Sequence, residues 1–160
     1  MLTMNKTTIF AIDPGTTESG YAVVEMPECK LIEFGKVPNE QLLSNAFFIA
    51  RKCDQFAIEM VASYGMPVGR EVFETCVWIG RFIQATQMYY NFVYRKDEKL
   101  CLCADPRAKD SNIRQALIDR YAKFDFKNGK GTKKNPDTFY GVSKDVWQAI
   151  AVAVTHYEKR

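Results

Sequence analysis

The residues from Thr7 to Glu25 constrain the fold of this chain more than any other segment does. An apolar run at residues 9–12 ends in a carboxylate at Asp13, and a Pro-Gly turn then leads into a second apolar run at residues 21–24. The pattern predicts two neighbouring strands of a hairpin, with Asp13 at the end of the buried first strand. A carboxylate beside a core is costly unless a positive charge meets it, and a bound cation commonly supplies that charge. An aspartate that merely starts the turn is the alternative.

The rest of the chain alternates between strand-like and helix-like segments. We expect further strands at residues 30–36, 55–62 and 100–104, and helices at residues 38–52, 70–90, 109–121 and 143–157. An antiparallel meander followed by right-handed crossovers gives a mixed five-stranded sheet with helices on both faces, which is an α/β fold. Residues 1–160 contain no internal repeat and no long linker, so we expect one domain. Residues 123–141 are rich in Gly, Lys and Asn and are predicted to be mobile.

The bulk properties indicate a protein of the cytoplasm. No apolar run approaches the roughly 18 residues that cross a bilayer, and the first residues lack the apolar centre of a secretory signal. The five cysteines are odd in number and mostly lie in apolar segments, which favours reduced thiols. With His156 as the single histidine, a structural zinc site is not expected.

The charge is distributed unevenly along the chain. Residues 1–93 carry a net charge of −3 and residues 94–160 a net charge of +6. A basic C-terminal half favours a polyanionic partner such as nucleic acid, and a solvated lysine-rich surface is the alternative.

Two further acids, Glu59 and Asp145, lie at positions where an acidic side chain needs an explanation. Glu59 lies in the middle of the otherwise apolar strand at residues 55–62, where it needs a partner, either a cation or an arginine such as Arg51 or Arg70. Asp145 lies in the first turn of the last helix, where the helix dipole alone would favour it. Helical spacing places Asp145 on the side of Gln148, so its carboxylate can also point at the sheet.

Three segments together resemble a known family. They are IDPGTTESGY at residues 12–21, AIEM at residues 57–60 and KDVWQAIAVAVTH at residues 144–156. In this order and at this chain length they resemble the RuvC-type Holliday-junction resolvases of the ribonuclease H-like superfamily. In detail the chain looks closest to the small resolvases of bacteriophages and prophages, which implies a bacterial or phage-infected cytoplasm.

The resemblance implies an active site with catalytic acids on the first strand, the fourth strand and the last helix. Asp13, Glu59 and Asp145 match these positions and are expected to hold two Mg²⁺ ions, for which Mn²⁺ can substitute, with Asp13 as the bridging ligand. Many relatives carry a second acidic or metal-binding residue where this chain has Gln148. Either Gln148 contributes a carbonyl oxygen or water fills that position.

The resemblance also implies contacts with branched DNA and a homodimer whose two active sites match the twofold symmetry of a junction. The loop after Glu59 reaches the junction in the resolvases, and the basic residues further along are expected to bind phosphates. The positions that we expect to bind DNA are Tyr64, Met66, Arg107, Lys109, Arg114, Lys130, Lys133 and Lys134.

The sequence therefore predicts a metal-dependent endonuclease that cleaves branched DNA, without a membrane or a nucleotide cofactor. A nuclease fold that binds branched DNA without cutting it is the main alternative, and a related nuclease acting on RNA or other branches is a second. The IDPGTTESG segment also looks like the phosphate loop of sugar kinases and actin-like ATPases. Those proteins clamp ATP between two such domains, and this chain has the length of one.

Overall fold

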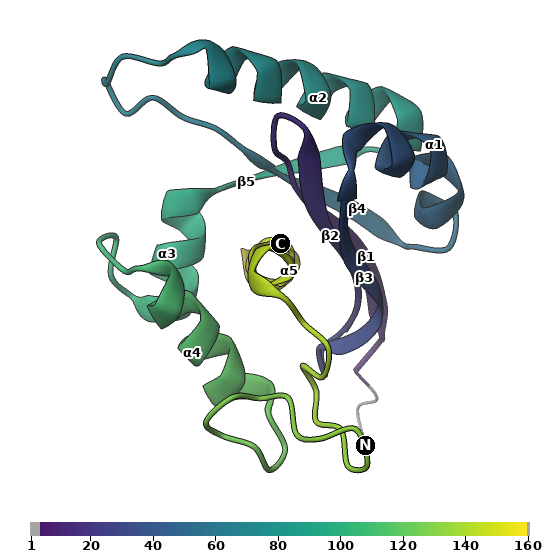
Figure 1. Cartoon of the computed structure of the whole chain (residues 1–160), viewed down its shortest axis with the longest axis vertical. Helices are drawn as coiled ribbons and strands as arrows, with labels where there is room; N and C mark the ends of the chain where they lie inside the picture. The colour runs from purple at the N-terminus through teal and green to yellow at the C-terminus, as the bar shows by residue number, and fades with distance from the viewer. Residues whose placement is uncertain (1–3, 160) are drawn as a thin grey trace.

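A computed structural model describes residues 4–159 as a mixed sheet with helices on both of its faces (Figure 1). The elements are β1 (Thr7–Asp13), β2 (Glu18–Met26), β3 (Lys30–Pro38), α1 (Asn39–Ala50), β4 (Gln55–Met60), α2 (Arg70–Thr86), β5 (Tyr90–Tyr94), α3 (Arg95–Cys103), α4 (Asp110–Tyr121) and α5 (Lys144–Lys159). The strand order in the sheet is β3-β2-β1-β4-β5. Within residues 4–159 no helix combines the length and the apolar character needed to cross a membrane.

Strand β1 lies at the centre of the sheet and has neighbours of opposite direction. It pairs antiparallel with β2, so that Asp13 lies opposite Gly20, and it pairs parallel with β4, so that Ile12 lies opposite Ile58. Asp13 and Glu59 are the next residues on these two strands, so they lie at the same end of the sheet. The mixed α/β sheet that the sequence predicts is confirmed.

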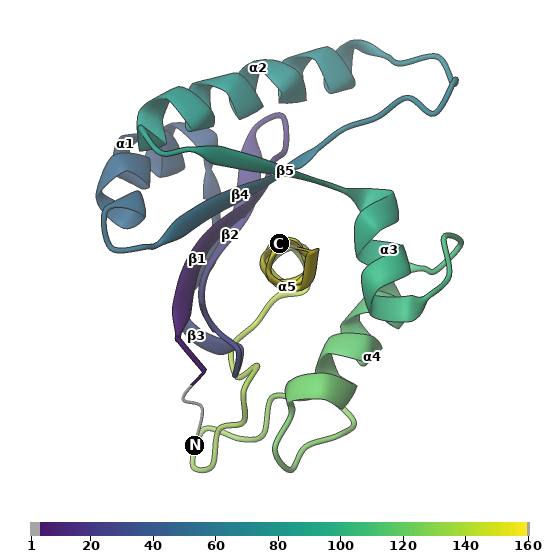
Figure 2. The ribbon, with the colours of Figure 1, turned by 180° about the vertical axis from the view of Figure 1, so that it is seen from behind.

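Both faces of β1 are covered, which explains its continuous apolar sequence. Ile9 and Ala11 belong to the apolar cluster beneath α5, whereas Phe10 and Ile12 belong to the cluster beneath α1 and α2. Figures 1 and 2 show α1 and α2 together on one face of the sheet and α5 against the other. Helices α3 and α4 form an outer layer beyond α5, so that α5 is enclosed between the sheet and this layer.

The fifth strand is not where the sequence predicts it. Residues 100–104 were expected to be a strand, but they form the end of α3 and its cap, and β5 is Tyr90–Tyr94. Helix α2 ends at Thr86 because Gln87 adopts a left-handed conformation, so the expected helix to residue 90 is too long. A short apolar run such as residues 100–104 fits either structure, and aromatic and β-branched residues favour a strand at YNFVY.

The carboxylate of Asp137 organises the segment that the sequence predicts to be mobile. Asp137 is buried and accepts hydrogen bonds from the backbone N–H groups of Lys123, Phe124, Asp125 and Thr138 at 2.7–3.2 Å. These backbone hydrogen bonds hold the pKa of Asp137 well below its usual range, against the effect of burial. Residues 123–141 thus form a defined loop that is tied to the end of α4.

Replacing Asp137 by Asn should destabilise the protein, because an amide has one acceptor oxygen where the carboxylate has two. We expect Asp137→Asn to lower the free energy of unfolding by about 2–3 kcal/mol at neutral pH, measured by urea denaturation. The low pKa stabilises the fold above the ordinary value of 3.8, so the difference from wild type should shrink as the pH falls below that value. Asp119→Asn, which removes an exposed carboxylate of α4, should change stability by less than about 0.5 kcal/mol. An equal loss in both variants would contradict this role of Asp137.

The start of α5 packs directly on the backbone of β2 at Gly20. A β-carbon at this position would lie 2.6 Å from the backbone oxygen of Asp145 and 3.1 Å from its carbonyl carbon. Only glycine leaves room for this approach, and backbone atoms cannot swing aside as a flexible side chain can.

Gly20→Ala should therefore lower the free energy of unfolding by about 1–3 kcal/mol, because the helix start must move away from the sheet. Gly80→Ala is the matched control, since nothing lies within 4 Å of the β-carbon that it would add to the middle of α2. That substitution should stabilise the protein by about 0.5–1 kcal/mol through helix propensity. Denaturation midpoints that rise in both variants would show that α5 does not need the close contact.

Candidate active site

Asp13 and Glu59 lie side by side at the carboxyl ends of β1 and β4. Burial raises the pKa of Asp13 to about 9, and the negative charge of Glu59 is the next contribution. The two carboxyl groups come from strands that are far apart in the sequence and meet because the strands are parallel. The structure thus brings together the first two of the acids that the sequence singles out.

A third carboxyl group, Glu98 in the first half of α3, joins this pair from the other side. Its side chain is fully buried. Burial raises the pKa of Glu98 to about 7. Burial and then the adjacent Glu98 raise the pKa of Glu59 well above its ordinary value. Asp13, Glu59 and Glu98 therefore form a continuous row of carboxyl groups, of which Glu98 is fully buried and the other two are partly buried.

Several oxygens of this row accept no hydrogen bond from the described part of the protein. Within residues 4–159, Oε1 of Glu59 and both carboxyl oxygens of Glu98 are buried without a hydrogen bond. Buried polar atoms are nearly always paired in folded proteins, and unpaired carboxylate oxygens are among the most costly exceptions. The row is therefore short of positive charge.

Arg95, at the start of α3, is the arginine that reaches the row. Its Nη1 lies 3.9 Å from Oε1 of Glu59 and 3.7 Å from Oε1 of Glu98. The same guanidinium donates a hydrogen bond to Oε1 of Gln148 and forms an ion pair with Asp110. One cation is thus divided among three acids and an amide, and it does not balance the buried charge. The sequence alternative that paired Glu59 with Arg51 or Arg70 is wrong, because Arg95 takes that place and Arg70 pairs with Glu74.

Asp145 lies at the edge of the site and is not part of the row. Its charge is near enough to contribute to the raised pKa of Asp13. However, its Oδ2 lies 2.5 Å from Nζ of Lys36, a residue of β3 that also lies 3.7 Å from Glu18. In this structure Asp145 is held by an ammonium group instead of facing Asp13 and Glu59 directly.

The acids fit a hard divalent cation by their chemistry. Their ligand atoms are carboxylate oxygens, which Mg²⁺ and Mn²⁺ prefer, and the ionised row would carry more negative charge than Arg95 offsets. Across the described residues, 4–159, no three His, Cys, Asp or Glu side chains already surround one common point as a finished cage. Binding would therefore require small side-chain movements, above all of Asp145 away from Lys36.

The sequence reasoning missed Arg95, Glu98 and Lys36. Arg95 and Glu98 lie three residues apart, which places them on one face of a helix. This signal was present in the segment RKDEK, but it becomes visible only when the strand is assigned to residues 90–94. Lys36 gives no local signal, because its partner Asp145 is brought near by tertiary packing.

The expected DNA-binding residues fall into separate regions. Tyr64 and Met66 are 61% and 71% exposed in the loop between β4 and α2, which projects from the body of the protein in Figures 1 and 2. Arg107 and Lys109 are exposed in the segment before α4. None of these four residues forms a hydrogen bond or an ion pair with the carboxyl row.

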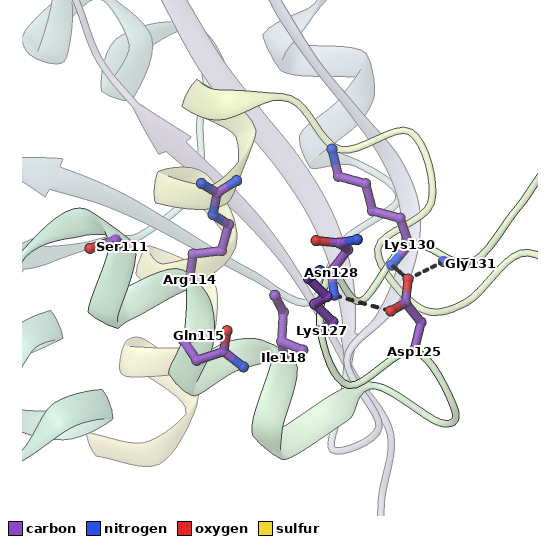
Figure 3. A pocket seen from close by; sticks show the side chains of 9 residues that line it. All are labelled: Ser111, Arg114, Gln115, Ile118, Asp125, Lys127, Asn128, Lys130 and Gly131. Atoms are coloured by element: carbon purple, nitrogen blue, oxygen red, sulfur yellow. Dashed lines mark hydrogen bonds between the residues drawn. The ribbon is translucent and has the colours of Figure 1, made fainter.

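The remaining expected residues lie on α4 and in the loop of residues 123–141, and they fall into two groups. Arg114 and Lys130 line a hollow between α4 and this loop, as Figure 3 shows. Lys133 and Lys134 are exposed further along the same loop and line neither this hollow nor the one beside Asp145.

Sequence comparison and structure comparison give different answers for this chain. No protein-family profile matches it, and no curated protein is similar to it in sequence. Its structure is similar to that of Thermus thermophilus RuvC in complex with a Holliday junction substrate, with a TM-score of 0.72 and 13% identity over 94% of this chain and 93% of the other. A second Thermus thermophilus RuvC structure matches with a TM-score of 0.71 and 15% identity, over the same shares of the two chains. The chain therefore has the ribonuclease H-like fold of RuvC, as the resemblance in its sequence implies.

Proposed function

We propose that the chain is a metal-dependent endonuclease that cuts phosphodiester bonds in branched DNA, with four-way junctions as its main substrate. The observation that carries this proposal is the row of largely buried carboxyl groups, with oxygens that accept no hydrogen bond, at the end of the central strands. The fold supports it, because one of the similar RuvC structures was solved with a Holliday junction substrate.

Four carboxylates would hold the metal ions. Asp13 lies centrally and is the proposed bridging ligand, with Glu59 and Asp145 on either side, as the sequence suggests. Glu98 adds a carboxylate beside Glu59. Two Mg²⁺ ions, which Mn²⁺ could replace, would supply the Lewis acidity that activates water and offsets the charge on the departing 3′ oxygen.

Arg95 and Lys36 have different roles in this proposal. Arg95 occupies Oε1 of Gln148 and contacts Glu98, so it positions both residues and leaves Gln148 a poor metal ligand in this arrangement. Lys36 is 44% exposed, and its ammonium group is paired with the Asp145 carboxylate in this structure. If Asp145 held a metal ion, the Lys36 ammonium would be free to bind a phosphate of the substrate.

The parts of the protein outside the carboxyl row suit a symmetric branched substrate. Tyr64 and Met66 form an exposed apolar tip that could enter an open branch point and stack on a base. Phe73 and Val77 are each 62% exposed on α2, on the side away from the sheet. We propose that this helix surface contacts a second copy of the chain, which would supply the second cut of a junction.

Removing any one of the three acids predicted from the sequence should abolish cutting. We expect Asp13→Asn, Glu59→Gln and Asp145→Asn each to slow the cleavage of a labelled four-way junction in Mg²⁺ by at least about a hundredfold. Junction binding, measured by fluorescence anisotropy in EDTA, should survive, because the neutral variants keep the fold.

Glu158→Gln is the control for this series, because it removes an exposed carboxylate from the opposite end of α5. It should cut at the wild-type rate. Asp145→Asn with wild-type activity would remove Asp145 from the site. A wild-type protein that binds junctions but never cuts them in Mg²⁺ or Mn²⁺ would leave the non-cutting DNA-binding protein as the correct alternative.

Glu98 can be tested apart from catalysis through metal-dependent stability. Mg²⁺ at ten times its Kd should stabilise the wild-type fold by about 1.4 kcal/mol, which raises the melting temperature by about 3–6 °C. Glu98→Gln should reduce this metal-induced shift to less than about half, because a buried carboxylate of the row becomes neutral. An undiminished shift in Glu98→Gln, with Glu158→Gln again as the control, would show that Glu98 is not a ligand.

A further inference from the structure

Two hollows on the surface join next to the candidate active site. The first, of about 370 Å³, is lined by Asp145 and Gln148 of α5 together with residues of α4 and the loop. The second, of about 470 Å³, lies between α4 and residues 125–131. Ser111, Arg114 and Lys130 line both hollows, so the two are continuous. We call this combined channel the basic groove.

The basic groove carries charges of both signs beside Asp145, where Arg114 and Lys130 also line it, and mainly positive charge farther away. Near the site the lining includes Asp110 and Asp145 together with Lys144. Farther away the cationic side chains are Arg114, Lys127 and Lys130. In Figure 3 the ends of the Arg114 and Lys130 side chains extend to the same side of the hollow.

The one acid that lines the outer hollow, Asp125, offsets only part of the charge of the three cations. The Asp125 carboxylate accepts hydrogen bonds from the backbone N–H groups of Asn128, Lys130 and Gly131 at 2.9–3.2 Å, drawn as dashed lines in Figure 3. These hydrogen bonds hold the pKa of Asp125 below its usual value. Asp125 thus stabilises the conformation of the loop through these hydrogen bonds.

Two of the three cations of the groove, Arg114 and Lys130, have contacts that favour their places beside the hollow. Arg114 lies against the ring of the buried Trp147, with 5.8 Å between its Cζ and the ring centre. Lys130 is half-buried, and its backbone is tied to Asp125. Binding to cations that are already held in place costs less side-chain entropy than binding to freely moving surface lysines.

We propose that the basic groove binds the phosphodiester backbone of one nucleic-acid strand and leads it away from the carboxyl row. This inference rests on the proposed nuclease function and deepens it, because it assigns a path to the strand on one side of the cut. A line of cations that starts beside a set of acids can contact successive phosphates of a strand whose next phosphate lies at the acids. The groove also divides the lysines of one loop into two classes, since Lys127 and Lys130 line it and Lys133 and Lys134 do not.

Two double variants of the full chain test the groove, and both remove two lysines from the same loop. We expect Lys127→Ala/Lys130→Ala to raise the Kd for a labelled four-way junction about tenfold at about 0.1 M salt, and to reduce the magnitude of the slope of log Kd against log salt by about 2. Lys133→Ala/Lys134→Ala should raise the Kd less than about threefold and leave the slope nearly unchanged. Anisotropy in EDTA separates binding from cutting, and melting temperatures show that both variants fold.

A second measurement locates the strand. Methylphosphonate linkages neutralise one phosphate of the junction at a time, scanned on both sides of the cut. In the wild type, the neutral linkages that weaken binding through the groove should lie on one side of the cut. These same linkages should have little further effect in Lys127→Ala/Lys130→Ala.

The outcomes distinguish the groove from the proposed function. Equal losses of affinity in the two double variants, or methylphosphonate effects that persist unchanged in Lys127→Ala/Lys130→Ala, would overturn the groove while junction cutting by the wild type stood. The expected difference in binding with no cutting in Mg²⁺ or Mn²⁺ would support the groove and overturn the nuclease. A wild type that binds no DNA would overturn both.

Discussion

The structure depends on the parallel pairing of β1 with β4, which places two partly buried carboxyl groups side by side. The pairing joins Ile12 to Ile58, and Asp13 and Glu59 follow at the end of the sheet. Glu98 then extends the row from α3, and among residues 4–159 Arg95 is the one guanidinium in contact with Glu59 and Glu98. The surrounding helices hold these like charges in place, because α5 is enclosed between the sheet and the outer layer of α3 and α4. The fold thus keeps a cluster of carboxyl groups whose pKa values are raised and whose ionised form Arg95 alone would not neutralise.

Much of this arrangement could be predicted from the sequence, because it depends on local patterns. The hairpin of β1 and β2, the buried strand around Glu59 and the helix that begins near Asp145 each have a clear apolar period. The order of these elements gives the mixed sheet. The glycine at position 20 belongs to the same segment as Asp13, although its reason, the close approach of α5, appears only in three dimensions.

The rest could not be predicted, because it depends on tertiary contacts or on an ambiguous period. The run at residues 100–104 suits a strand or a helix equally, and assigning it to a strand hid Arg95 and Glu98 within the expected connection. The ion pair of Lys36 with Asp145 joins residues that are more than a hundred positions apart. Residues 123–141 have the composition of a flexible segment, and only the positions of Asp125 and Asp137 explain why they form a shaped loop.

The most direct test of this account is the anomalous scattering of manganese in crystals of the protein soaked with Mn²⁺. The account predicts a peak against the carboxyl oxygens of Asp13 and Glu59, with Asp145 turned away from Lys36 and towards the ion. Crystals that show no peak at these carboxyl groups, with Asp145 still paired with Lys36 at saturating Mn²⁺, would contradict it.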